Sequence, residues 1–149
     1  MTTIQNTITV YTDGGSRGNP GPAALGVTIG APIRKGYSKY LGKKTNNEAE
    51  YEAVIFALAK LKGLLGKKNC ETLKVIFKMD SDLAVSQLSD RWKIEGKKIV
   101  PLFVKVHNLR LDFGEVMFQH IPREENGDAD TLVNQELNKH THEETLFNL

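Results

Sequence analysis

Two hydrophobic periodicities divide the chain into strands and helices. Apolar residues alternate with polar or small ones in five stretches, and this period of two predicts β-strands at residues 4–12, 23–30, 33–41, 73–79 and 115–121. Amphipathic helical spacing replaces the alternation at residues 45–65, 83–89, 101–110 and 128–138. The predicted order of elements is therefore βββαβααβα.

This order predicts an α/β fold with a mixed five-stranded sheet flanked by helices. Short links between the first three strands favour an antiparallel meander. A right-handed crossover through the helix at 45–65 then places the fourth strand parallel to the first and beside it. We expect residues 1–138 to form one domain. We expect residues 139–149 to be a loose C-terminal tail, with His140 and His142 solvated rather than bound to metal.

The composition excludes several classes of protein. A chain of 149 residues with 40% hydrophobic and 26% charged residues is typical of a single soluble domain. Its formal charge of +2 is too small by itself to indicate a nucleic-acid partner. Cys70 is the only cysteine, which indicates a reducing compartment without disulfides. Because the sequence contains neither a membrane-length apolar run nor a secretory signal, we expect a cytoplasmic protein with no membrane partner.

Four carboxylates occupy positions that apolar or small residues normally fill. Asp13 ends the alternation of the first strand just before a glycine-rich turn, and Asp80 ends the fourth strand. Glu50 begins the apolar stripe of the first helix, and Asp130 lies on that of the last. An ordinary turn or a helix cap would explain any one of them alone. Adjacent first and fourth strands would instead bring Asp13 and Asp80 together, with both helices packed toward the same edge.

Other carboxylates have simpler interpretations. Glu48 and Glu52 are expected to be solvated in the first helix, where Thr45-Asn46-Asn47 supplies capping side chains. Either Ser81 or Asp82 is expected to cap the helix at 83–89.

Four anionic groups on core-facing positions cannot all stay ionised unless cations neutralise them. Oxygen ligands without histidine or cysteine favour magnesium or manganese over zinc. Two such ions about 3.5–4 Å apart can activate a water and stabilise the leaving oxygen of a phosphodiester. The residue types therefore point to two-metal phosphodiester chemistry.

In this order and on these elements, the motifs resemble ribonuclease H of type 1 over residues 6–138. Asp13 lies in TDGGSxGNPGP, and Glu50 follows Thr45 by five residues, as in that family. Asp80 precedes a serine, and Asp130 ends the run NGDAD. The resemblance implies cleavage of the RNA strand of RNA–DNA hybrids, leaving 5′-phosphate and 3′-hydroxyl ends.

The resemblance also assigns roles to these side chains. Asp13 would bridge two Mg²⁺ ions, with Mn²⁺ as a substitute, while Glu50 and Asp80 complete one site and Asp130 holds the other ion. Discrimination of RNA from DNA requires partners for 2′-hydroxyls. Donors and acceptors for them are available from the backbone of Gly14 and Gly15 and from the side chains of Asn46 and Asn47. The resemblance makes Thr45 and Asn19 candidates for phosphate contacts.

The chain departs from the family in three places. Residues 89–99 are too few for the basic helical protrusion of longer bacterial forms, and Asp82 replaces a glutamine that contacts bases. The loop before the fourth carboxylate lacks the Gly-His pair of many members, in which a mobile histidine is thought to help product leave. An ungapped count places His120 there, whereas alignment of the strands places Arg123 there. We favour Arg123, because its guanidinium can pair with a phosphate.

Two other functions compete with this interpretation. A non-catalytic hybrid-binding module would be expected to have lost carboxylates, and all four are present. An actin-like ATPase shares the fold core but needs a second comparable domain, for which 149 residues leave no room. We therefore predict a monomeric ribonuclease H. Its basic connector, residues 91–98, is expected to contact phosphates, with Trp92 either along the DNA strand or buried.

Overall fold

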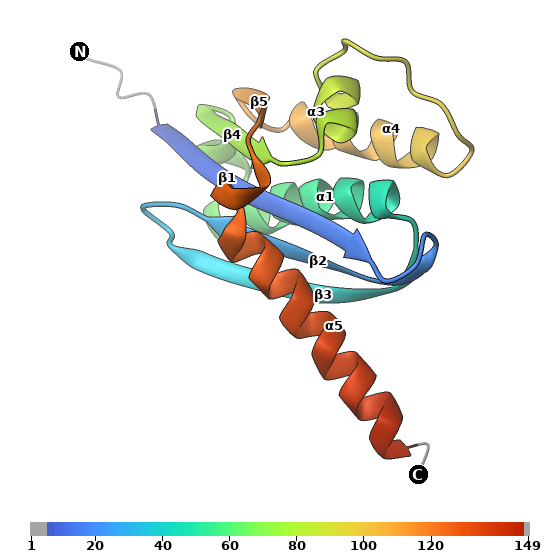
Figure 1. Cartoon of the computed structure of the whole chain (residues 1–149). Helices are drawn as coiled ribbons and strands as arrows, with labels where there is room; N and C mark the ends of the chain where they lie inside the picture. Colours follow the sequence, from blue (N-terminus) through green and yellow to red (C-terminus); the bar gives the residue numbers. More distant parts are fainter. Residues whose placement is uncertain (1–5, 148–149) are drawn as a thin grey trace, which may run out of the picture.

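The computed structural model describes residues 6–147, with side chains up to residue 141 (Figure 1). The five strands are β1 (Asn6–Ser16), β2 (Gly21–Ile29), β3 (Lys35–Lys44), β4 (Leu73–Met79) and β5 (Glu115–His120). The helices are α1 (Asn46–Leu65), α2 (Lys67–Cys70), α3 (Asp82–Leu88), α4 (Ile99–Arg110), the 3-10 turn η1 (Arg123–Glu125) and α5 (Gly127–Phe147).

The strands form one sheet in the order β3-β2-β1-β4-β5. β1, β2 and β3 pair antiparallel, and β1, β4 and β5 pair parallel. This confirms the predicted meander and the adjacency of the first and fourth strands. The carboxyl ends of β1 and β4 therefore meet at one place, where open α/β sheets bind their ligands.

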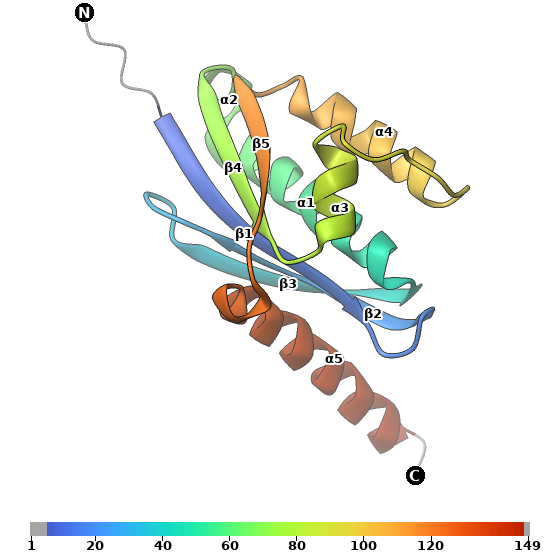
Figure 2. The same cartoon turned by 45° about the horizontal axis from the view of Figure 1, so that its top comes forward.

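The two faces of the sheet are covered by different helices (Figures 1 and 2). α1 packs on β1 and β2 and contacts α3 and α4, so these helices form one layer. α5 packs on the other face of β2, β3 and β1. The alternation of β2 shows the division, because Leu25 and Val27 belong to the large core under α1, whereas Ala24 packs with Val133 and Leu137 of α5.

α5 is longer than the sequence pattern indicated. We expected a loose tail from residue 139, but the helix continues to Phe147, and residues 148–149 lie outside the described part. No glycine or proline follows Gly127 to stop the helix. The His140 ring stacks on Tyr40 with centroids 3.6 Å apart, so it is not simply solvated. The side chain of His142 lies outside the described residues.

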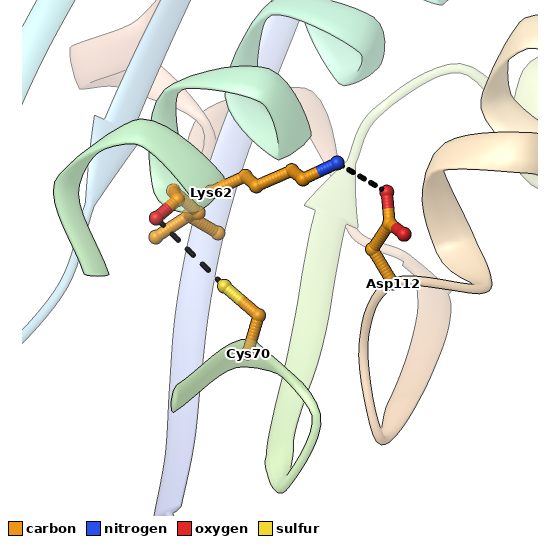
Figure 3. A network of polar contacts seen from close by, with 4 residues as sticks. Lys62, Cys70 and Asp112 are labelled. Atoms are coloured by element: carbon orange, nitrogen blue, oxygen red, sulfur yellow. Dashed lines mark hydrogen bonds and ion pairs between the residues drawn. The ribbon is translucent and has the colours of Figure 1, made fainter. Parts of the chain in front are cut away.

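The far end of α1 is held by polar contacts (Figure 3). Lys62 Nζ pairs with Asp112 Oδ2 at 2.9 Å, and the Cys70 thiol lies 3.9 Å from the carbonyl oxygen of Leu61. Burial raises the pKa of the Cys70 thiol, so this cysteine packs as a small uncharged side chain.

The connector after α3 and the lengths of the helices complete the description. No helix forms between Leu88 and Ile99, as expected for a form without the basic protrusion. Within residues 6–147, none of the helices combines the length and apolar character that crossing a bilayer requires.

Candidate active site

Asp13 lies on β1 where a glycine permits unusually close packing. Asp13 is 7% exposed. The next residue, Gly14, faces the backbone of α1 so closely that a Cβ there would lie 2.2 Å from the carbonyl carbon of Ala49 and 2.5 Å from the amide nitrogen of Glu50. Only a residue without a side chain allows this approach. The glycine after Asp13 therefore brings the first turn of α1 against β1.

Glu50 reaches the site from the first turn of α1. The helix begins with a capping box, in which Thr45 Oγ1 accepts from the Glu48 amide and Glu48 Oε1 accepts from the Thr45 amide. Glu50 Oε1 accepts a 2.8 Å hydrogen bond from the Gly14 amide. Its Oε2 atom is buried and receives no hydrogen bond from a donor among the described residues. An unpaired buried carboxylate oxygen is costly unless a cation or a proton meets it.

Asp80 completes a cluster of three. It follows the last residue of β4, and Ser81, not Asp82, caps α3 by accepting from the Ala84 amide. One carboxylate oxygen from each of Asp13, Glu50 and Asp80 lies within 4.8 Å of the others. Asp13 and Glu50 are buried, and Asp80 is half-buried.

Asp130 enters the same cleft from the opposite layer. It lies in the first turn of α5, near Val133 and Leu137, as the apolar stripe predicted. All four predicted carboxylates line one cleft. The structure therefore gathers them from β1, α1, the end of β4 and α5.

Burial and mutual repulsion alter the acidity of this cluster. The pKa of Asp13 is raised to about 7, chiefly by burial; a hydrogen bond with Glu50 lowers it, and the charges of Asp80 and Asp130 contribute to the rise. The pKa of Glu50 is raised well above its ordinary value, first by burial and then by Asp13. Without a counter-ion the site thus favours protonation.

The donor set fits a hard divalent cation. The ligands are carboxylate oxygens alone, which Mg²⁺ and Mn²⁺ prefer. The three clustered carboxylates, including Glu50, whose Oε2 accepts no hydrogen bond within the described part of the chain, provide charge that a cation would balance. The residues that would hold such ions are Asp13, Glu50, Asp80 and Asp130.

Amide side chains form the rim above the carboxylates. Asn19, Asn46 and Asn47 line the cleft together with Gly14 and Gly15. Several of these groups already have partners. The Gly14 amide donates to Glu50, and Asn19 Oδ1 accepts from the Asn46 amide at 2.9 Å.

The start of α1 lies beside this rim, and only part of it lines the cleft. Asn46 Oδ1 accepts from the amide of Ser16, which joins the start of α1 to the end of β1. Thr45 is the N-cap of α1 and is not among the residues that line the cleft. Glu48 is 5% exposed, so the expectation that it is solvated was wrong. The capping box holds it against the backbone, and its signature, a threonine three residues before a glutamate, is present in the sequence at Thr45 and Glu48.

The two candidates for the turnover residue lie in different surroundings. Arg123 begins η1, is exposed and lines the cleft. His120 is the last residue of β5, and its Nε2 lies 3.3 Å from the carbonyl oxygen of Asp80. The prediction that His120 remains on the strand is confirmed. The alignment by strands therefore leaves Arg123 facing the site.

The sequence interpretation assigned no role to two buried amides. Asn126 is 1% exposed and contacts both β1 and Asp80. Gln87 is 5% exposed; its Oε1 accepts from Tyr51 at 2.9 Å and from Asn47 at 3.4 Å, and its Nε2 donates to the carbonyl oxygen of Lys93. Asn126 begins the motif NGDAD. Because asparagine just before a helix is commonly an N-cap, its position in the sequence indicated no other role. Gln87 gave no signal beyond its position in a short helix.

Comparison with known proteins decides the family. The family model described as reverse transcriptase-like matches residues 11–136. A ribonuclease H from Dechloromonas aromatica is 31% identical over 147 residues, covering 89% of this chain and 95% of that protein. The chain belongs to the ribonuclease H family.

Solved structures of the family agree with the fold. The structure of LC11-RNase H1, isolated from compost and in complex with an RNA/DNA hybrid, has a TM-score of 0.84 and 40% identity to this chain. The match covers 90% of this chain and 99% of that one. A bifunctional protein of Mycobacterium tuberculosis is 34% identical over 131 residues, which are 85% of this chain and 34% of that protein. The chain thus spans about a third of the length of the mycobacterial relatives it matches.

Proposed function

We propose that this chain is an endonuclease that hydrolyses the RNA strand of RNA–DNA hybrids and leaves 5′-phosphate and 3′-hydroxyl ends. The observation that carries the proposal is the convergence of four carboxylates in one cleft of a ribonuclease H fold. The similar LC11-RNase H1 was solved with an RNA/DNA hybrid, which supports the same substrate class here. All four carboxylates come from one chain, which supports a monomer. The single buried cysteine supports a reducing, cytoplasmic location.

We propose Mg²⁺ as the natural cofactor, in two sites, with Mn²⁺ as a substitute. Bound cations would supply Lewis acidity for water activation and for the leaving oxygen. Asp13 would contribute to both sites, Glu50 and Asp80 to one, and Asp130 to the other. The Gly14 hydrogen bond fixes one oxygen of Glu50 and leaves the other for a ligand.

The groups around the carboxylates would bind and orient the hybrid. Asn46, Asn47 and the backbone of Gly15 offer polar groups to the minor groove, where 2′-hydroxyls identify the RNA strand. Asn19 and Thr45 would support phosphate contacts at the start of α1. Arg123, exposed at the cleft, would draw the cleaved strand away through its guanidinium.

The exposed connector supplies a second contact. Arg91, Lys93, Lys97 and Lys98 are all exposed, and Trp92 is 50% exposed, so the alternative of a buried tryptophan is wrong. Cationic groups around an aromatic ring favour contact with a nucleic-acid strand.

The test is cleavage of a hybrid with a 5′-labelled RNA strand, compared with single-stranded RNA, double-stranded RNA and double-stranded DNA. We expect cleavage of the hybrid that requires Mg²⁺ and stops with EDTA. Asp13→Asn, purified identically, controls for contaminating nuclease, because it removes a ligand charge without changing the shape of the side chain. It should lose cleavage and retain hybrid binding by fluorescence anisotropy.

A variant Asp13→Asn that still cut hybrid at the wild-type rate would contradict the proposed site. Tight hybrid binding by wild type without cleavage, in Mg²⁺ and in Mn²⁺, would favour the non-catalytic binding module.

A further inference from the structure

Asn126 connects three of the four carboxylate-bearing segments. It follows η1 and precedes α5, and its side chain points into the protein instead of capping the helix. Its Nδ2 donates to the carbonyl oxygen of Thr12 at 2.9 Å and lies 3.5 Å from Asp80 Oδ2. The main-chain carbonyl oxygen of Asn126 accepts a hydrogen bond from the main-chain amide of Asp130 at 3.1 Å. One residue thus contacts β1 beside Asp13, the carboxylate after β4, and the turn that carries Asp130.

The end of the Asn126 side chain must be a hydrogen-bond donor. The Thr12 carbonyl and the Asp80 carboxylate are both acceptors, so the amide nitrogen must face them. This orientation leaves Asn126 Oδ1 buried without a partner among the described residues, a state that costs about 1–3 kcal/mol. An ordinary N-cap would not need this arrangement, because serine or aspartate caps a helix as well.

We propose that Asn126 is a positioning residue that sets the spacing between Asp13, Asp80 and Asp130 and thereby the affinity of the site for divalent cations. The inference rests on the proposed function only in that it concerns the same carboxylates. Asp13 and Glu50 are already placed by the contact of α1 with β1. Asp130 arrives on a helix of the opposite layer, and the Asn126 amide ties the start of that helix to β1 and β4.

The decisive variant is Asn126→Ser. Serine is as favourable as asparagine just before a helix, but its hydroxyl is too short to span both acceptors. Mn²⁺ affinity is measured by calorimetric titration of the substrate-free protein. We expect it to weaken about 10–100-fold, as for other groups that orient metal ligands. Asn126→Ala should weaken it at least as much.

Hybrid cleavage supplies a second measurement. The kcat of Asn126→Ser should fall about 10–100-fold with KM within about twofold, because the hybrid-binding rim is unchanged. Asn108→Ser is the matched control, since Asn108 is exposed on α4. It should leave Mn²⁺ affinity, kcat and KM unchanged.

The outcomes separate the inference from the proposed function. Wild-type Mn²⁺ affinity in a folded Asn126→Ser protein would overturn the inference, even with a lower Tm, because the contacts of Asn126 would then serve stability alone. Loss of folding in both variants would also overturn it. If wild type binds Mn²⁺ but cleaves no hybrid, the proposed function fails, while the titration still decides the role of Asn126.

Discussion

Asp13 and Glu50 lie inside the packed contact between β1 and α1. The other site residues, Asp80, Asp130 and Arg123, lie at the solvent-facing junction of β4, η1 and α5. We call these the inner and outer parts of the site. In the inner part both carboxylates are buried, and main-chain packing at Gly14 places them. In the outer part the carboxylates are half-buried and Arg123 is exposed.

This difference suggests a division of labour. Backbone packing is rigid, so the inner part is suited to holding ligands in one geometry. Side chains at a solvent-facing junction can move when substrate binds or product leaves. Damage to the inner part should therefore affect folding and catalysis together, and damage to the outer part should affect turnover in a folded protein.

The largest effect is expected from Gly14→Ala. The added Cβ would overlap the backbone of Ala49 and Glu50, forcing α1 away from β1. We expect the free energy of unfolding to fall by about 1–3 kcal/mol or more, measured as a fall of several degrees in Tm. Hybrid cleavage should be lost as well.

Gly63→Ala is the matched control, because Gly63 lies in α1, the helix that Gly14 contacts, and has nothing within 4 Å of an added Cβ. It should leave cleavage unchanged and raise Tm slightly, since alanine favours the helix. If both variants behaved like wild type, close packing at Gly14 would not define the inner part.

Arg123→Ala tests the outer part. Losing a charge-assisted contact of about 1.5–3 kcal/mol should lower kcat about 10–100-fold, with a smaller rise in KM and no change in Tm. Arg123→Lys should recover part of the activity, because lysine keeps the charge without the planar fork. A greater loss of kcat in His120→Ala than in Arg123→Ala would assign the turnover role to the histidine instead.

The raised pKa of Asp13 predicts a dependence of stability on pH in EDTA. Between pH 4 and pH 7 the folded chain holds a proton that the unfolded chain has released, because the pKa rises from 3.8 to about 7 on folding. Stability should therefore fall as pH rises through this range and level off above about pH 7. Asp13→Asn carries no charge there, so its Tm at pH 8 should exceed that of wild type by several degrees.

Asp128→Asn is the control for this measurement, because Asp128 is an exposed carboxylate in the first turn of α5. Its pH profile should follow that of wild type. Equal Tm values for Asp13→Asn and wild type at pH 8 would show that burial does not strain the inner part.

The smallest effect concerns the connector, which lies outside both parts. The double variant Lys97→Ala, Lys98→Ala removes two phosphate contacts. The slope of the logarithm of the hybrid-binding constant against the logarithm of salt concentration should flatten by about 1.8, and kcat should stay unchanged. The exposed pair Lys67 and Lys68 on α2, at the far end of α1, provides the control double variant. An unchanged slope would exclude the connector from the interface.

Local patterns in the sequence determined most of the fold and the identity of the four carboxylates. Strand alternation, helix stripes and turn glycines depend on neighbours a few residues apart, so β4 and the core face of α1 were predicted closely. Asp13, Glu50, Asp80 and Asp130 were recognisable because each interrupts such a pattern.

Contacts between distant segments were decided only by the tertiary structure. The Gly14 amide donates to Glu50 across 36 residues, and Asn126 reaches Thr12 across 114. Neither pairing follows from local spacing, since each depends on how α1 and α5 pack on opposite faces of the sheet. The helical continuation of residues 139–147 was missed for the same reason, because polar residues there gave no apolar stripe, while His140 stacks on Tyr40 of β3. Periodicity along the chain shows which face of an element is buried, but only packing between elements shows which polar groups meet.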